Sequence, residues 1–169
     1  MNNMWAPWRM DYIKSSKPEG CIFCDKPKQH DDRDSLILHR GQTCFVIMNF
    51  YPYNNGHLMV VPYRHISHLE LLTVNEQTEM ISLLTQSSKI IKTSMQPDGL
   101  NIGMNLGKIA GAGIDDHLHF HIVPRWNGDT NFMPVLGHTK VIAQALYETW
   151  DMLKLHFQNL PSCFSSPAL

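Results

Sequence analysis

The sequence has no apolar stretch near the length of about 20 residues that a membrane-spanning helix needs. Its first residues, MNNMWAPWRMDYIK, also lack the apolar core of a secretory signal peptide, so we expect a chain that is not exported. Charge of one sign is not in excess, because 14 Lys and Arg residues oppose 15 Asp and Glu residues. Proteins that bind nucleic acid or a membrane surface through a basic face carry more positive charge. We therefore expect neither partner for this chain.

Cysteine is also scarce in the sequence. The 169 residues include four, of which two form a C-x-x-C pair and two are isolated: Cys21, Cys24, Cys44 and Cys163. This pattern is a poor disulfide framework for a chain of this length, so a reducing cytoplasm is the expected setting. Hydrophobic residues make up 43% of the chain, which is too many for a disordered protein of such small net charge. The length suits one domain with a sizeable core.

The predicted elements favour an α+β fold. Runs of Ile, Leu, Val and Phe, bounded by turn residues, predict strands over 36–39, 44–48, 57–62, 100–106 and 117–124. A helix is predicted over 73–95, where Thr73 and Glu76 have the spacing of a capping box and apolar residues such as Val74 and Ile81 recur at roughly helical spacing. A second helix is predicted over 139–157. Strands in runs around one long helix, without strict β-α alternation, indicate the α+β class.

The sequence shows no internal repeat and no second-domain boundary. We expect an N-terminal strap over 1–19, a single domain over 20–159 and a flexible tail over 160–169. The tryptophans of the strap, Trp5 and Trp8, either dock on the domain or contact a ligand or partner subunit. Residues 25–35 are polar and predict a loop or a frayed helix.

Histidine is abundant, and three of the ten residues alternate in one short run: His117, His119 and His121. Alternate side chains of a strand point to the same face, so the three imidazoles share one face and the apolar residues between them face the core. A row of polar rings needs partners, because unpaired buried polar groups are costly. The run therefore indicates a metal-binding face or a nucleophile flanked by assisting groups, with a solvated face as the third alternative.

The triad and its surroundings resemble the histidine-triad (HIT) family of nucleotide-binding proteins. The resemblance rests on His117-x-His119-x-His121, on the segment NGHLMVVPYRH at 55–65 and on Asn105 followed by a glycine-rich loop, and it covers about residues 20–126. The segments WAPWR at 5–9 and PRWNGDTNF at 124–132 resemble the branch of diadenosine tetraphosphate phosphorylases and hydrolases. The resemblance implies a mostly antiparallel sheet of about five strands with one long helix and a C-terminal helix, paired with a second copy in a homodimer.

The resemblance also implies an activity. His119 would attack the α-phosphorus of a dinucleoside polyphosphate and carry the nucleotidyl group, and His121 would hydrogen-bond phosphate oxygens. Water or inorganic phosphate would then release the nucleotide. Two alternatives are a nucleoside phosphoramidase and a nucleotide-binding regulatory protein with incidental turnover.

Further nucleotide contacts are implied by the same resemblance. Asn49 occupies the position of the family's ribose-binding residue. Asn105 and the loop residues Gly111, Ala112 and Gly113 would hold the phosphates through amide and backbone N–H donors. One position departs from the family, because Gly113 stands where its hydrolases usually carry Gln or Ser, and the group that assists the leaving oxygen is therefore open.

The C-x-x-C pair has three interpretations. A thioredoxin-like redox pair requires a β-α-β context that this sequence lacks, two incidental cysteines need no partner, and half of a zinc site would use both thiolates on one tetrahedral ion. The family resemblance implies that His65 and His117 complete a structural zinc site with Cys21 and Cys24. His68 is a competing ligand, and His57 is expected to be a polar support near the triad.

The remaining polar candidates carry weaker signals. Four histidines are expected at the surface: His30, His39, His138 and His156. Arg125 either neutralises a polyphosphate or forms an ordinary ion pair, and Trp126 either stacks on a second base or takes part in packing. Asp129 is most simply a turn residue.

Overall fold

The computed structural model describes residues 20–129, 145–158 and 160, so the expected strap over 1–19 and the tail beyond residue 160 lie outside the described residues. The described chain forms one five-stranded sheet in the order β1-β2-β3-β5-β4. The strands are β1 (Ile37–Arg40), β2 (Cys44–Met48), β3 (Leu58–Pro62), β4 (Gly99–Gly103) and β5 (Phe120–Arg125). Every neighbouring pair is antiparallel, which confirms the predicted α+β architecture.

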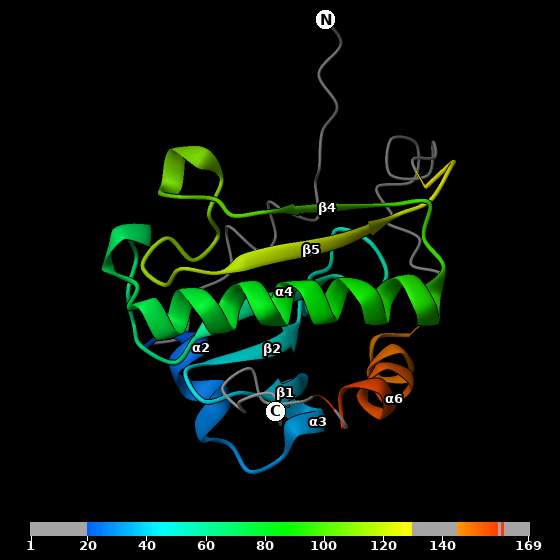
Figure 1. The fold of residues 1–169 in the computed structure, drawn as a ribbon, viewed down its shortest axis with the longest axis horizontal. Coiled ribbons are helices and arrows are strands. Elements are labelled where there is room, and N and C mark those ends of the chain that lie inside the picture. Colours follow the sequence, from blue (N-terminus) through cyan, green and yellow to red (C-terminus); the bar gives the residue numbers. More distant parts are fainter. Residues whose placement is uncertain (1–19, 130–144, 159, 161–169) are drawn as a thin grey trace, which may run out of the picture.

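Helices cover the sheet and its β1 edge. The long helix α4 (Val74–Met95) runs across one face and contacts β2 and β3, and α6 (Leu146–Phe157) packs against β1 and α4 (Figure 1). Short helices α2 (Ile22–Asp25) and α3 (Asp32–Ser35) precede β1, and the 3-10 turns are η1 (Lys26–Lys28), η2 (Leu69–Leu71) and η3 (Lys108–Ala110). In the described part of the chain, no helix is both long and apolar enough to span a membrane.

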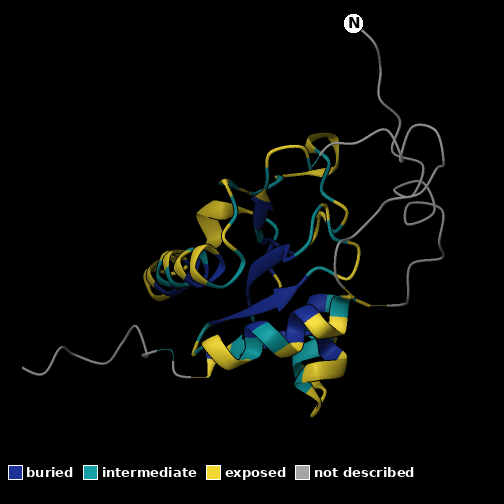
Figure 2. Cartoon of the chain, turned by 90° about the vertical axis from the view of Figure 1, so that its right-hand side faces the viewer, coloured by how far each residue is buried: buried dark blue, intermediate teal, exposed yellow. Residues whose placement is uncertain are grey.

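The core lies between the sheet and these helices. Every residue of β2 and β3 is buried, and the helices present exposed residues on their outer faces (Figure 2). Strands that are buried on both faces are continuous apolar runs, as in the sequence CFVIM of β2. Strands β2 and β3 therefore lie inside the core.

The pairing of β3 with β5 brings the histidines together. Met59 lies opposite His121, and Val60 lies opposite Phe120. Because the two strands are antiparallel, the segment after β3 lies beside the segment before β5, and the Leu118 N–H donates to the Ile66 carbonyl at 2.6 Å. Residues 65 and 117, which are 52 positions apart in the sequence, therefore meet at one end of the sheet.

Helix α4 begins with the predicted capping box. The Thr73 hydroxyl accepts from the Glu76 N–H, and the Glu76 carboxylate accepts from the Thr73 N–H. Its buried face differs from the apolar spacing noted above, because Val74 and Ile81 are exposed whereas Glu76 and Glu79 face the core. The carboxylates take these positions because partners from other segments satisfy their oxygens.

Three predicted boundaries differ from the observed ones by more than one residue. Helix α6 does not extend back through Ala145, which has the extended dihedrals φ −62° and ψ 144°, and residues 139–144 lie outside the described residues. Strand β4 ends at Gly103 and not at 106. Strand β5 begins at Phe120 and not at 117, because His117 and Leu118 bond to the segment around β3 and leave the ladder with β4.

Candidate active site

Four predicted metal ligands meet where α2, β3 and β5 converge. The Cys21, Cys24, His65 and His117 ligand atoms all lie within 4.8 Å of one another, and we refer to this group as the Cys2His2 cluster. Cys21 precedes α2 and Cys24 lies in it, so a single helical turn presents both thiols. His68 is exposed before η2 and is not part of the cluster.

The geometry of the Cys2His2 cluster fits a tetrahedral metal ion. The His117 Nδ1 lies 3.2 Å from Cys21 Sγ and 3.6 Å from Cys24 Sγ, and Cys24 Sγ lies 3.4 Å from the His65 Nδ1. Tetrahedral zinc with ordinary Zn–S and Zn–N bonds separates its ligand atoms by about 3.3–3.8 Å. The observed distances fall close to this range, so the cluster could hold such an ion with little movement.

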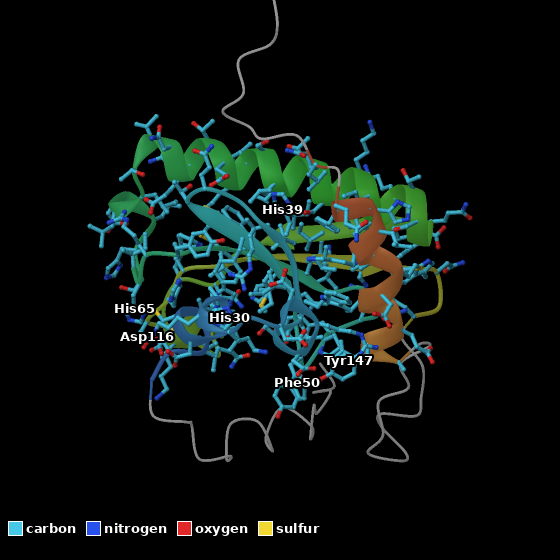
Figure 3. The ribbon with its side chains drawn as sticks, turned by 90° about the horizontal axis from the view of Figure 1, so that it is seen from below. His30, His39, Phe50, His65, Asp116 and Tyr147 are labelled. Atoms are coloured by element: carbon cyan, nitrogen blue, oxygen red, sulfur yellow. The ribbon has the colours of Figure 1, made fainter. Side chains whose placement is uncertain are left out.

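Polar groups outside the cluster lie against the imidazoles of His117 and His65. The His117 Nε2–H donates to the Pro62 carbonyl at 2.9 Å, which leaves the Nδ1 lone pair directed at the thiols. The His65 Nε2 lies 3.8 Å from Asp116, and Figure 3 shows these two side chains together at one end of the molecule. Burial raises the pKa of the Cys21 thiol to about 11, so a cation is what would stabilise its thiolate.

His119 is a buried imidazole with one defined tautomer. Its side chain is 6% exposed, and its Nδ1–H donates to the His117 carbonyl at 2.8 Å. The lone pair is therefore on Nε2. Burial lowers the pKa of His119 and favours the neutral ring. A neutral imidazole with an unprotonated Nε2 is a competent nucleophile toward phosphorus.

A chain of hydrogen bonds sets the tautomer of His121. The Tyr53 backbone N–H donates to His57 Nδ1 at 3.0 Å, so the proton of His57 is on Nε2. That Nε2–H donates to His121 Nδ1, also at 3.0 Å, and the proton of His121 is therefore on its own Nε2. The ring centroids of His119 and His121 lie 4.7 Å apart, so a ring with an unprotonated Nε2 adjoins a ring with a protonated Nε2. His57 lies where the sequence predicted a polar support for the triad.

The predicted nucleotide-binding residues lie in loops around the triad. Asn49 follows β2, and its Oδ1 accepts from the Tyr51 N–H at 2.9 Å. Asn105 reaches the Gly111 carbonyl at 3.5 Å. Gly111 has a positive φ of 91°, which favours glycine at this position. Ala112 is half-buried and Gly113 is exposed.

Arg125, at the end of β5, and Asp129 bond to each other. Arg125 pairs with Asp129 at 2.6 Å and with Asn101 at 3.0 Å, which is the ordinary ion pair of the two alternatives. Asp129 also accepts from the Trp126 N–H, as a turn residue does. Of the histidines expected at the surface, His30 and His156 are exposed, whereas His39 on β1 is half-buried and His138 lies outside the described residues.

Phe23 is the residue at the site that the sequence reasoning missed. It lies between the two cysteines, is 1% exposed, and packs its ring 5.4 Å from that of His117 and 4.9 Å from that of His119. The available signal was an aromatic residue inside the C-x-x-C pair. Tyr53 was also missed, because its contribution to the His57 tautomer is a backbone N–H.

Comparisons with known proteins show the family to which the chain belongs. The chain is 39% identical to an AP-4-A phosphorylase of Mycobacterium tuberculosis over 95% of its own length and 87% of the relative. It is 30% identical, over 55% of its length and 62% of the relative, to a bis(5'-adenosyl)-triphosphatase of Dictyostelium discoideum. A Zn-bound histidine triad family protein from Mycobacterium smegmatis superposes with a TM-score of 0.65 at 23% identity, covering 82% of this chain and 93% of that one. The HIT domain family model matches residues 31–128, and the chain belongs to the HIT family.

Proposed function

We propose that this protein cleaves dinucleoside polyphosphates of the diadenosine tetraphosphate type through a covalent nucleotidyl-histidine on His119. The observation that carries the proposal is the defined tautomer of that ring, whose Nδ1–H is held by the His117 carbonyl while Nε2 keeps its lone pair. The M. tuberculosis relative is named for phosphorolysis of such a substrate, which supports this substrate class.

In the first step, the His119 Nε2 attacks the α-phosphorus. A phosphorus–nitrogen bond forms as the bond from phosphorus to the bridging oxygen breaks, and the departing polyphosphate takes the electron pair. His121 donates its Nε2–H toward the phosphate oxygens, where negative charge develops. In the second step, inorganic phosphate or water attacks the phosphorus, and the bond to nitrogen breaks so that Nε2 recovers its lone pair.

The leaving oxygen requires a proton or a hydrogen bond. Gly113 offers only backbone at the position where related hydrolases carry a side chain. His121 is the imidazole beside His119, and the chain through His57 holds its proton on Nε2. We therefore assign assistance of the leaving group to His121, in addition to its contact with the phosphate.

Loops on the same side of the sheet would hold the substrate. We assign contact with the ribose hydroxyls to Asn49. Asn105 and the backbone of Gly111, Ala112 and Gly113 would bind the polyphosphate through N–H donors. The positive φ of Gly111 supports this assignment, because it turns the backbone of the loop.

We propose zinc as the ion of the Cys2His2 cluster, bound by Cys21, Cys24, His65 and His117. Two sulfur and two imidazole ligands are the set that structural zinc sites prefer. When bound, the ion would cross-link α2 to the segments that flank β3 and β5, with no open position for substrate. Reduced thiols at Cys21 and Cys24 would suit a cytoplasmic setting.

We also propose a homodimer in which the β4 edges of two copies pair. Strand β4 is at the end of the strand order, and its residues Asn101, Ile102 and Gly103 are exposed. An exposed edge strand is a template for pairing with another strand, and Ile102 adds apolar surface at 48% exposure. The balanced charge gives no support for a nucleic-acid or membrane partner.

Separation of the products from diadenosine tetraphosphate, with and without inorganic phosphate, tests the proposal. ADP and ATP that form only with phosphate identify a phosphorylase. AMP and ATP that form without phosphate identify an asymmetric hydrolase. No cleavage in either condition overturns the proposed substrate, and cleavage of an adenosine phosphoramidate alone would then identify the phosphoramidase alternative.

A further inference from the structure

Phe23 links the Cys2His2 cluster to the proposed nucleophile. The residue lies between Cys21 and Cys24, so its backbone is part of the turn that presents both thiols. Its ring is fully buried and packs at 4.9 Å from the His119 ring with an angle of 52° between the planes. The same ring meets that of His117 nearly edge-on, at 5.4 Å and 71°.

The cluster also holds the backbone on which His119 depends. The His117 ring is tied to Cys21 at 3.2 Å and to the Pro62 carbonyl at 2.9 Å. The carbonyl of the same residue accepts the Nδ1–H of His119. The tautomer of His119 thus rests on the backbone of a cluster residue, and the orientation of its ring rests on the aromatic side chain that the cysteine turn delivers.

We infer that Phe23 is a positioning residue that transmits the state of the Cys2His2 cluster to His119. With the cluster closed by a metal ion, the turn at 21–24 is fixed and the Phe23 ring limits the rotation of the imidazole. With the cluster open, the turn at 21–24 can shift and move Phe23, and the His119 imidazole then loses its contact with the Phe23 ring. The inference rests on the proposed function only for its activity readout, because the orientation of His119 can be observed without substrate.

The physical reason for an effect on rate is the precision that nucleophilic attack requires. The lone pair of Nε2 must point along the line of attack on phosphorus, and a misplacement of about 1 Å can cost about 100-fold in rate. Substrate binding uses other groups, so its affinity depends less on this ring. Loss of Phe23 is therefore expected to lower kcat and to leave KM nearly unchanged.

The test compares Phe23→Leu with the wild-type protein, each in the zinc-loaded and the chelator-treated form. We expect Phe23→Leu to retain zinc and to lower kcat by about 10- to 100-fold. We expect zinc removal to lower kcat of the wild type by a similar factor. In Phe23→Leu, zinc removal should change kcat by less than about threefold, because the substitution has already broken the connection between the cluster and His119. Phe157→Leu is the matched control, since Phe157 is also 1% exposed but lies on α6 against β1.

Imidazole NMR of ¹⁵N-labelled protein at constant pH gives a readout without substrate. The zinc-loaded wild type is expected to show a single Nδ1–H tautomer for His119. An imidazole that is no longer held by the Phe23 ring can rotate away from the His117 carbonyl that fixes its tautomer, so we expect a mixture of tautomers in both Phe23→Leu and the zinc-free wild type. A single tautomer in all forms, additive losses of kcat, or an equal loss in Phe157→Leu would overturn the inference. If no protein turns over dinucleotide, the proposed function fails, and the NMR comparison still decides the role of Phe23.

Discussion

Two groups of buried polar side chains, one on helix α4 and one in the segment that precedes β5, form hydrogen bonds in different ways. Glu76 and Glu79 on α4 are each 3% exposed, and His117 and His119 are 1% and 6% exposed. The Glu79 carboxylate accepts from the Gln42, Thr43 and Cys44 N–H groups and from the Thr43 hydroxyl. Both of its oxygens are thus committed to the turn between β1 and β2, and the pKa of Glu79 is lowered by these bonds against the opposing effect of burial.

Each of the two buried imidazoles instead uses one nitrogen to donate to a backbone carbonyl and keeps a lone pair on the other nitrogen. His119 donates its Nδ1–H to a backbone carbonyl and keeps a lone pair on Nε2. His117 donates its Nε2–H to a backbone carbonyl and directs the Nδ1 lone pair at the thiols of the Cys2His2 cluster. The difference separates structure from chemistry, because a buried group whose atoms all have partners stabilises the fold, whereas one with a reserved atom can bind or react. Substitutions in the two groups should therefore have different effects, on activity or metal binding for the histidine site and on stability for the glutamates.

The largest effect is expected from His119→Ala. Removal of the proposed nucleophile should lower turnover of diadenosine tetraphosphate by about 1000-fold or more. The free energy of unfolding, measured with urea, should change by less than about 1.5 kcal/mol, because the substitution removes a hydrogen bond to a backbone carbonyl. His30→Ala, at an exposed histidine, is the control and should retain full activity. Wild-type turnover in His119→Ala would place the chemistry elsewhere.

Cys24→Ser should affect metal binding nearly as strongly. Serine is a poor ligand for zinc, and loss of one of four ligands should lower the affinity by at least about 100-fold. Metal content per chain, measured after dialysis against a weak chelator, should fall from about one ion to almost none. Cys44→Ala is the matched control, because Cys44 is buried on β2 outside the cluster and its removal should leave the metal content unchanged. Equal metal content in both variants would contradict the site.

Among the buried carboxylates of α4, the substitution Glu79→Ala should lower stability without changing activity. The substitution leaves the backbone N–H groups of residues 42–44 without their carboxylate, and a loss of about 3 kcal/mol in the free energy of unfolding is expected. The activity per folded molecule should remain at the wild-type value. Lys89→Ala, at an exposed position of the same helix, should change stability by less than about 0.5 kcal/mol. A large loss of kcat in folded Glu79→Ala would remove the distinction between the two groups.

The smallest effect concerns acid. The hydrogen bonds from the Arg64 guanidinium lower the pKa of Glu76 to about 2, against burial, and the capping bonds of Thr73 add to them. Because the folded pKa lies below the unfolded value of 4.5, its stabilising contribution is complete above about pH 4.5 and disappears as the pH falls toward 2. Glu76 adds at most about 1.4 kcal/mol per pH unit to the slope of the free energy of unfolding against pH. Urea unfolding from pH 5 downward should show a shallower decline in Glu76→Gln, and identical slopes would contradict this account.

Local patterns were enough to predict much of the fold. The five strands and the capping box of α4 depend on alternation, turn residues and the pair Thr73 and Glu76, all of which are near neighbours in the chain. The Cys2His2 cluster combines a local pair with two histidines that only the family resemblance could supply. The meeting of these four residues was therefore predicted, but not from spacing alone.

Long-range contacts account for what could not be predicted. The burial of Glu76 and Glu79 depends on Arg64 and on the turn at 42–44, which supply the hydrogen-bond donors for the two carboxylates. The start of β5 at Phe120 depends on the bonds of His117 and Leu118 to the segment around β3. The tautomers of His57 and His121 depend on a backbone N–H of a loop, and no pattern of side chains reports its direction.

The central claim is that His119 Nε2 forms a bond to phosphorus. The most direct measurement mixes the protein with diadenosine tetraphosphate, quenches the reaction in alkali within the first turnover and maps the peptides by mass spectrometry. We expect an adenylyl group on the peptide that contains His119. It should be absent in His119→Ala and should be removed when the unquenched intermediate meets its acceptor. An unmodified His119 peptide while product accumulates at the wild-type rate, or a label on another residue that forms at that rate, would contradict it.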